Sequence, residues 1–259
     1  MILWVDAAHD PEENMRRDRA LLACAEQGAE PVLRLFTFAP HGITLGAREK
    51  PEVALDLDRC RDDGIPWALR PTGGRAIFHA DEWTYSLAAP LDHPEWGGTQ
   101  TEAYRRVSGL IADSLRRLGV PADLVRPERD TAATSAAACF ASTARHEIEV
   151  GGRKLVGSAQ RRTQNGLLQQ GSVLLGDGHL RLADYVRADE RAGLRALLGR
   201  SACHAGPWIG DRTRLEDWAD ALLAVLGDGV RRHLAADGLF LLTLENAGSY
   251  TAALAQLER

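Results

Sequence analysis

A glycine-rich stretch flanked by arginines, residues 70–76 (RPTGGRA), has the residue types for ligand chemistry, and His79 follows it closely. Glycine tolerates positive φ and lets a ligand approach the main chain, while Arg70 and Arg75 can bind a phosphate or a carboxylate. The spacing matches neither a P-loop nor a dinucleotide-binding fingerprint. Two interpretations stay open: a ligand-binding loop, or a hairpin turn with solvated arginines.

A second pair of residues, Cys139 and Lys154, has the chemistry of an activated nucleophile. Lys154 follows a Gly-Gly turn, and a cation close to a thiol lowers the thiol pKa and raises the thiolate fraction. If the Lys154 side chain points inward, its ammonium stays charged only beside an anion or a developing oxyanion. The alternatives are a solvated lysine at a strand end and a buried, inert cysteine. Together with the glycine loop, this pair suggests acyl transfer.

The other candidate nucleophiles and metal ligands point to no further site. Cys24 falls on the apolar stripe of a helix, and Cys60 and Cys203 have no convincing partners, so all three are expected to be structural. The histidines form no HxxxH or HExxH pair, so no metal site is expected. Only His79 is a functional candidate, with a buried structural histidine as the alternative. No GxSxG elbow is present, which disfavours a serine hydrolase.

The bulk composition argues against several classes of protein. With a formal net charge of -5, the 259-residue chain lacks the basic character expected of a nucleic-acid-binding protein. No apolar run approaches the roughly 18 residues needed to cross a membrane, and the N-terminus lacks the features of a signal peptide. The cysteines form no CxxC pair, which is typical of a reduced protein. We therefore expect a cytoplasmic protein with no nucleic-acid or membrane partner.

Residue periodicity indicates one sheet-centred α/β domain that must position these side chains. Helical spacing predicts helices over 14–26, 56–63, 101–118 and 214–226, and helical patterns dominate from residue 180 onward. Apolar runs predict strands over 32–38, 43–46, 67–70, 75–78, 84–88, 146–150, 154–160, 167–175 and 239–244. The turn at 40–42 suggests that strand 43–46 pairs with strand 32–38, and the glycines at 151–152 predict a hairpin.

Taken in order, these motifs resemble the biotin/lipoate protein ligase superfamily. Within it, the chain is most similar to the octanoyl-[acyl carrier protein]:protein N-octanoyltransferases related to lipoate-protein ligase A. The similarity covers residues 14–15, 18, 44–46, 70–79, 81–86, 139–140, 147, 152–160 and 170–172. The resemblance implies a single α/β (α+β) catalytic domain over residues 1–259, with a central mixed sheet flanked by helices.

The resemblance also implies roles for individual residues. Cys139 is expected to take the acyl group as a thioester, and Lys154 to assist it. The expected substrate-binding residues are Arg70, Gly73, Gly74, Arg75, His79, Gly157, Ser158 and Ala159. Gln169 departs from the pattern, since many members carry histidine there.

Two branches of the superfamily must be separated. ATP-dependent lipoate ligases use Mg-ATP and an acyl-adenylate, whereas the octanoyltransferases need no cofactor. Arg75, the segment 82–85 and Cys139 favour the transferase. Its expected partners are octanoyl-acyl carrier protein and the lipoyl domains of 2-oxoacid dehydrogenase subunits or the glycine cleavage H protein. The ATP-dependent ligase is the alternative enzyme, and a non-catalytic protein that binds these partners is the alternative of another class.

Overall fold

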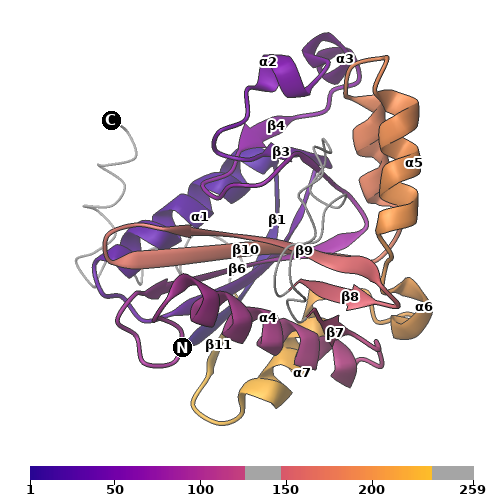
Figure 1. Cartoon of the computed structure of the whole chain (residues 1–259). Helices are drawn as coiled ribbons and strands as arrows, with labels where there is room; N and C mark the ends of the chain where they lie inside the picture. Colours follow the sequence, from indigo (N-terminus) through magenta and orange to yellow (C-terminus); the bar gives the residue numbers. More distant parts are fainter. Residues whose placement is uncertain (126–146, 235–259) are drawn as a thin grey trace.

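The computed structural model describes residues 1–125 and 147–234, which form a large and a small β-sheet surrounded by helices (Figure 1). β1 runs parallel to both of its neighbours in the large sheet, and the other neighbouring pairs are antiparallel. The predicted central mixed sheet is confirmed. The strand order of the large sheet is β11 (Arg231–Leu234), β1 (Ile2–His9), β2 (Val32–Phe38), β6 (Glu82–Pro90), β10 (Gly166–Leu174), β9 (Arg153–Arg162), β8 (Ile148–Val150) and β7 (Asp123–Leu124).

Helices cover both faces of the large sheet. The described helices are α1 (Pro11–Glu26), α2 (Pro51–Ala54), α3 (Leu57–Asp62), α4 (Gln100–Arg117), α5 (Arg191–Ser201), α6 (Gly206–Ile209) and α7 (Leu215–Leu226), with the 3-10 helix η2 (Gly178–Asp184). Helix α1 lies on one face, while α4 and α7 lie on the other (Figure 1). Because alternate residues of a strand face opposite sides, Leu3 and Val5 join the core with α4 and α7, and Ile2 and Trp4 join the core with α1.

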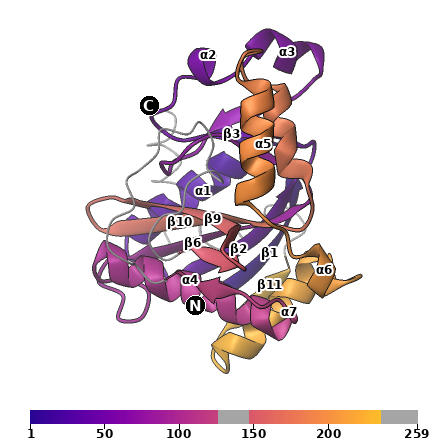
Figure 2. The same cartoon turned by 45° about the vertical axis from the view of Figure 1, so that its right-hand side comes forward.

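The small sheet has the order β4 (Trp67–Leu69), β3 (Gly42–Leu45) and β5 (Ile77–His79). Its apolar side chains share a core with η2 and α5, which includes the buried residues Phe78, Leu182 and Leu194. Figure 2 shows α5 standing beside this sheet, away from α4 and α7. The small sheet therefore packs on η2 and α5, and the glycine loop connects its strands β4 and β5.

The predicted pairing of strand 43–46 with strand 32–38 is wrong. Both edges of β2 are occupied, by β1 on one side and β6 on the other. The Ile43 N–H instead donates to the carbonyl of Pro66 at 2.9 Å, which places β3 alongside β4. Because β3 also lies between β4 and β5, the segment 70–76 connects two strands that do not pair, and the hairpin interpretation of that loop is also wrong.

A buried polar cluster that the sequence did not predict joins α1 to the sheet. The fully buried guanidinium of Arg34 donates to Asp6 at 2.8 Å and to Asp18 of α1 at 2.7 Å. Asp18 also accepts from Gln170 of β10 at 2.5 Å, and the Gln170 amide oxygen accepts from the Thr72 hydroxyl at 2.7 Å. Since buried charges are stable only when paired and hydrogen-bonded, this chain of contacts fixes α1, β10 and the glycine loop relative to one another.

The other predicted elements divide into three groups. Helices at 14–26, 56–63, 101–118 and 214–226, strands at 32–38, 67–70, 75–78, 84–88 and 167–175 and the hairpin at 146–160 are confirmed, with ends that differ by a few residues. Strands β1, β7 and β11 and the helix α2 were not predicted, whereas α5, α6 and most of η2 lie in the region from residue 180 onward where helical patterns were expected. The strand expected at 239–244 lies outside the described residues.

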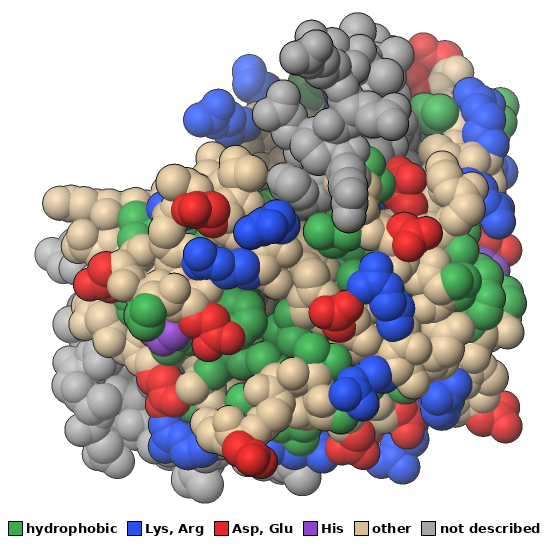
Figure 3. All heavy atoms as spheres, turned by 60° about the horizontal axis from the view of Figure 1, so that its bottom comes forward, with side chains coloured by type: hydrophobic (Ala, Val, Ile, Leu, Met, Phe, Trp, Pro, Cys, Tyr) green, Lys and Arg blue, Asp and Glu red, His purple; other side chains and the backbone are tan. Residues whose placement is uncertain are grey.

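The helices and the surface charges were also compared with what a membrane-spanning or strongly basic protein would show. Among the described residues, no helix combines the length and the apolar character that crossing a bilayer requires. Acidic and basic side chains are interspersed over the face shown in Figure 3.

Candidate functional site

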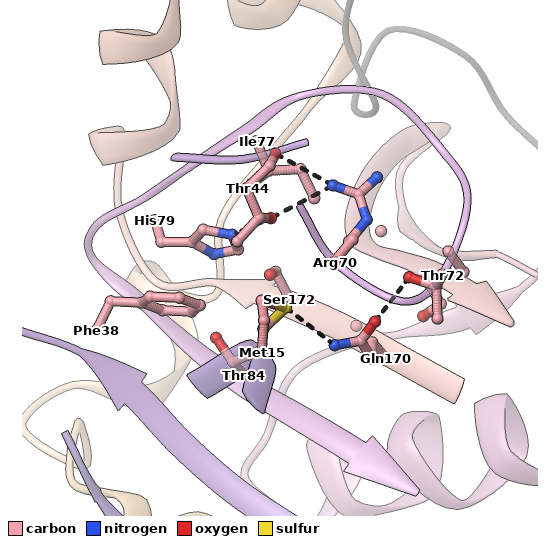
Figure 4. A pocket seen from close by; sticks show the side chains of 14 residues that line it. Met15, Phe38, Thr44, Arg70, Thr72, Ile77, His79, Thr84, Gln170 and Ser172 are labelled. Carbon is pink, nitrogen blue, oxygen red and sulfur yellow. Dashed lines mark hydrogen bonds between the residues drawn. The ribbon is translucent and has the colours of Figure 1, made fainter. Parts of the chain in front are cut away.

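A narrow pocket lies where the small sheet meets the large one (Figure 4). Five of the predicted substrate-binding residues line it: Arg70, His79, Gly157, Ser158 and Ala159. The lining residues that were not predicted come from α1, five strands and the glycine loop, and they are Met15, Phe38, Thr44, Thr72, Ile77, Thr84, Gln170, Gly171 and Ser172. Gly73, Gly74 and Arg75 are not among the lining residues.

Arg70 holds the glycine loop in place. Its buried guanidinium donates to the carbonyl of Gly73 from Nε at 3.0 Å and from Nη2 at 2.9 Å, and to the carbonyl of Arg75 at 2.8 Å. Its Nη1 donates to the Thr44 carbonyl at 3.2 Å. These bonds direct the guanidinium to backbone carbonyls, whereas the sequence suggested a phosphate or carboxylate ligand for it. Arg70 thus shapes the wall of the pocket to which it also contributes.

The two glycines of the loop differ in what the structure requires of them. Gly74 has a φ of 93°, which favours glycine. Its carbonyl packs so closely on Gly46 that a Cβ at Gly46 would lie 2.0 Å from the oxygen. A Cβ at Gly73 would meet nothing within 4 Å. The close packing in this part of the chain therefore depends on Gly46 and Gly74, and the space beside Gly73 is open.

The imidazole ring of His79 is fixed by hydrogen bonds to both ring nitrogens and by stacking on one face. Its Nε2 lies 2.7 Å from the Thr44 hydroxyl, and its Nδ1 lies 2.5 Å from Oε1 of Glu82. The Phe38 ring stacks on the imidazole, with 3.9 Å between centroids. All these side chains are buried, so His79 is a fixed part of the pocket wall. Among the described residues, no group of histidine, cysteine and carboxylate side chains is arranged to hold a metal ion.

Lys154 points inward, and the solvated interpretation of this residue is wrong. Its side chain is 3% exposed and pairs with the carboxylate of Glu147, which is also 3% exposed. Glu147 is therefore the anion that an inward ammonium was expected to need. Lys154 lies on β9, three positions before the pocket residue Gly157, but it is not among the residues that line the pocket.

The remaining cysteines fit the structural role predicted for them. Cys24, Cys60 and Cys203 are buried and form no disulfide. Burial raises the pKa of the Cys24 thiol to about 11, and burial together with Asp56 raises the pKa of the Cys60 thiol to about 11. Burial also raises the pKa of Cys203. Cys139 lies outside the described residues, so its pairing with Lys154 stays a prediction.

Ser158 is positioned by a buried tyrosine. The Tyr85 hydroxyl lies 2.8 Å from the Ser158 hydroxyl and accepts from the Gln169 amide at 3.2 Å. A Cβ at Gly171 would lie 2.4 Å from the Tyr85 ring and 2.6 Å from the Ser158 hydroxyl, so only glycine leaves room for this contact. Burial raises the pKa of Tyr85, which therefore serves as a neutral hydrogen-bonding group.

Comparison with curated proteins finds relatives over most of the chain. The octanoyltransferase LipM of Moorella thermoacetica is 37% identical over 213 residues, which cover 78% of this chain and 76% of the relative. The octanoyltransferase LipM of Carboxydothermus hydrogenoformans is 32% identical over 222 residues, which cover 84% of this chain and 81% of the relative.

Solved structures share the fold at lower sequence identity. The bi-partite lipoate protein ligase of Thermoplasma acidophilum has a TM-score of 0.69 at 18% identity, over 91% of this chain and 87% of the other. A lipoate-protein ligase A bound with ATP has a TM-score of 0.68 at 18% identity, over 95% of this chain and 94% of the other. The arrangement of sheets and helices is thus that of the lipoate ligases.

A family model agrees with both comparisons. The model of the lipoyl protein ligase A/B catalytic domain matches residues 10–196, which include the glycine loop, Lys154 and the strands that line the pocket. The sequence resemblance is thereby confirmed at the level of the family. The chain belongs to the lipoyl protein ligase A/B catalytic domain family.

Proposed function

We infer that this chain carries the octanoyltransferase activity for which its curated relatives are named, and that it acts in protein lipoylation. One structural observation supports the chemistry most directly. Lys154 is buried with a carboxylate partner, on the same strand as the pocket residues Gly157, Ser158 and Ala159. An ammonium held inside the protein beside a pocket is suited to stabilise a thiolate or a developing oxyanion.

The proposed reaction is a ping-pong acyl transfer through Cys139. The Cys139 thiolate attacks the thioester of octanoyl-acyl carrier protein, which gives an octanoyl-enzyme thioester and the free carrier thiol. The amine of a lysine on a lipoyl domain then attacks the acyl-enzyme, forming an amide and releasing Cys139. Lys154 stabilises the thiolate and polarises the thioester carbonyl. A thioester supplies the driving force for the amide, so the proposal includes no ATP and no metal ion.

The pocket is proposed to hold the acyl chain. Arg70, His79, Gly157, Ser158 and Ala159 support this assignment because they line the pocket. The proposal keeps Gly73, Gly74 and Arg75 as substrate-binding residues through the backbone of the loop, where the open space beside Gly73 suits the approach of a substrate. The catalytic domain is proposed to span residues 1–259 and to act in the cytoplasm.

The acceptors are proposed to be lipoyl domains of 2-oxoacid dehydrogenase subunits or the glycine cleavage H protein. The test is transfer of an octanoyl group from octanoyl-acyl carrier protein to a purified lipoyl domain in the absence of ATP. Wild-type protein should transfer the group, and Lys154→Ala should slow the transfer by about 10²-fold or more. Modification of the lipoyl domain that needs free octanoate or lipoate with Mg-ATP would instead identify an ATP-dependent ligase. Binding of the carrier without any transfer would leave a non-catalytic binding protein.

A further inference from the structure

Three buried side chains at the pocket are hydrogen-bonded in the order hydroxyl, imidazole, carboxylate. Thr44 of β3 lies 2.7 Å from Nε2 of His79 on β5, and Nδ1 of His79 lies 2.5 Å from Glu82 on β6. Thr44 and His79 both line the pocket, and Figure 4 shows them side by side at its wall. A carboxylate on one ring nitrogen and a hydroxyl on the other is an arrangement that moves protons in many acyl-transfer enzymes.

The Glu82 carboxylate is held by other hydrogen bonds besides the one with His79. Oε1 of Glu82 also accepts from the hydroxyls of Thr84 at 2.7 Å and Ser172 at 3.2 Å. Phe38 holds the imidazole against rotation out of this plane. The side chains of His79 and Glu82 are 4% and 2% exposed, so bulk water does not reach the bond between them. Glu82 therefore sets the orientation of His79.

The same contacts suit both protonation states of His79. In the neutral ring, Nδ1–H donates to Glu82, and Nε2 accepts from the Thr44 hydroxyl. In the imidazolium, both ring N–H groups donate, and the Thr44 oxygen accepts while its own proton turns toward the pocket. Two further ionisable groups face these residues: Nη1 of Arg70, 3.3 Å from the Thr44 hydroxyl oxygen, and His179 of η2, which interacts electrostatically with Glu82.

We propose that Thr44, His79 and Glu82 form a proton relay for the acyl transfer, in which Thr44 touches the reacting groups and Glu82 is a positioning residue. The proposal rests on the octanoyltransferase function inferred above. When Cys139 attacks the donor thioester, a carbon–sulfur bond forms to Cys139, and the bond to the carrier sulfur breaks. The carrier thiolate then receives the Thr44 hydroxyl proton, which the His79 imidazolium replaces from Nε2.

The second half of the reaction restores the relay. When the neutral amine of the acceptor lysine attacks, a carbon–nitrogen bond forms, and the bond to Cys139 breaks to release its thiolate. The ammonium of the tetrahedral intermediate gives a proton to the Thr44 oxygen, and the Thr44 hydroxyl proton passes to Nε2 of His79. The enzyme returns to a Cys139 thiolate and a His79 imidazolium, and no oxidant, reductant or other co-reactant is needed.

The test measures each half-reaction separately by intact mass: acylation by octanoyl-acyl carrier protein, and transfer from the acyl-enzyme to a lipoyl domain. Thr44→Val keeps the shape of the side chain but removes the hydroxyl, and it should slow both half-reactions by about 10²-fold. Thr44→Ser should restore most of the rate. Thr37→Val on β2, at a position outside the pocket, is the matched control and should leave both rates unchanged.

The kinetic constants of Glu82→Gln test the role of Glu82. This variant keeps the size of the side chain but removes the negative charge that orients His79, so kcat of both half-reactions should fall by about 10-fold or more while KM for the donor stays near the wild-type value. A merely structural role of Glu82 would lower the amount of folded enzyme without changing kcat per folded molecule.

The experiments distinguish failure of the proton relay from failure of the octanoyltransferase function. If wild-type protein forms the acyl-enzyme and Thr44→Val does so at the same rate, the relay is overturned, and the octanoyltransferase function stands. An unchanged kcat in folded Glu82→Gln also overturns the relay. If wild-type protein forms no acyl-enzyme at all, the octanoyltransferase mechanism fails, and the relay fails with it.

Discussion

The buried pair of Lys154 and Glu147 makes a prediction that separates stability from catalysis. Glu147→Gln keeps the size of the side chain but removes the carboxylate charge that pairs with the Lys154 ammonium, which is 3% exposed. Removing one partner of a buried ion pair costs about 3–5 kcal/mol of folding free energy. At about 2–4 °C per kcal/mol for a protein of this size, the midpoint of thermal unfolding should fall by roughly 6 to 20 °C.

A double variant provides the comparison. Glu147→Leu combined with Lys154→Met replaces the pair by apolar side chains, which is often neutral or stabilising. The double variant should therefore unfold near the wild-type midpoint or above it, yet transfer octanoyl groups no faster than Lys154→Met alone. Circular dichroism gives the midpoint, and intact mass gives the acylation rate. The reasoning is refuted if the free energy of unfolding of Glu147→Gln lies within about 1 kcal/mol of the wild-type value. It is also refuted if the apolar double variant transfers octanoyl groups at the wild-type rate.

Three further predictions address the loop, the acid stability and the buried thiols. Gly46→Ala should lower the free energy of unfolding by about 1–3 kcal/mol because its Cβ would lie 2.0 Å from the Gly74 carbonyl, whereas Gly73→Ala should leave thermal unfolding nearly unchanged. Burial raises the pKa of Glu13, but hydrogen bonds from Arg16 and Arg17 outweigh burial and lower the pKa from 4.5 to about 2. This carboxylate stabilises the fold above pH 4.5 and loses its contribution as pH falls toward 2, so stability over that range should depend less on pH in Glu13→Gln, as urea titrations at several pH values can measure. Cys24 and Cys60, with thiol pKa values of about 11, should resist iodoacetamide at pH 8 in the folded protein and react after denaturation; rapid labelling of either thiol in the native state would contradict their burial.

The sequence was most informative where a local pattern determines the structure. The long amphipathic helix at 101–118 has apolar residues at helical spacing, and its N-terminus carries a capping box between Thr99 and Glu102. The hairpin at 146–160 follows from two apolar runs around Gly151 and Gly152, both of which have positive φ. In each case the residues that decide the element are neighbours in the sequence.

Contacts between distant segments were beyond this kind of reasoning. The pairing of β3 depends on β1 and β6 occupying both edges of β2, and nothing in residues 32–46 records that competition. The buried Arg34 has its partners on β1 and α1, so a local pattern gives no sign that its charge is satisfied. Both cases involve segments that meet only after the sheet has formed.

For the candidate site, the sequence predicted residues but not the contacts that hold them. The inward orientation of Lys154 was one of two interpretations, and only the structure identifies Glu147 as its partner. His79 was expected in the ligand cavity, but its contacts with Thr44 and Glu82 come from two other strands. Arg70 was expected to bind an anion because its charge was visible, while the loop carbonyls that accept its hydrogen bonds were not.

The central claim is that Cys139 carries the acyl group, and the most direct measurement is intact mass spectrometry after incubation with octanoyl-acyl carrier protein without ATP. Wild-type protein should gain one octanoyl group that hydroxylamine removes and that passes to an added lipoyl domain. Cys139→Ala should gain none, and Cys139→Ser should transfer poorly. An unchanged octanoyl adduct in Cys139→Ala, or near-normal transfer by Cys139→Ser, would contradict the assignment of the nucleophile. Absence of an adduct in wild type, together with lipoyl-domain modification that requires Mg-ATP, would show a ligase.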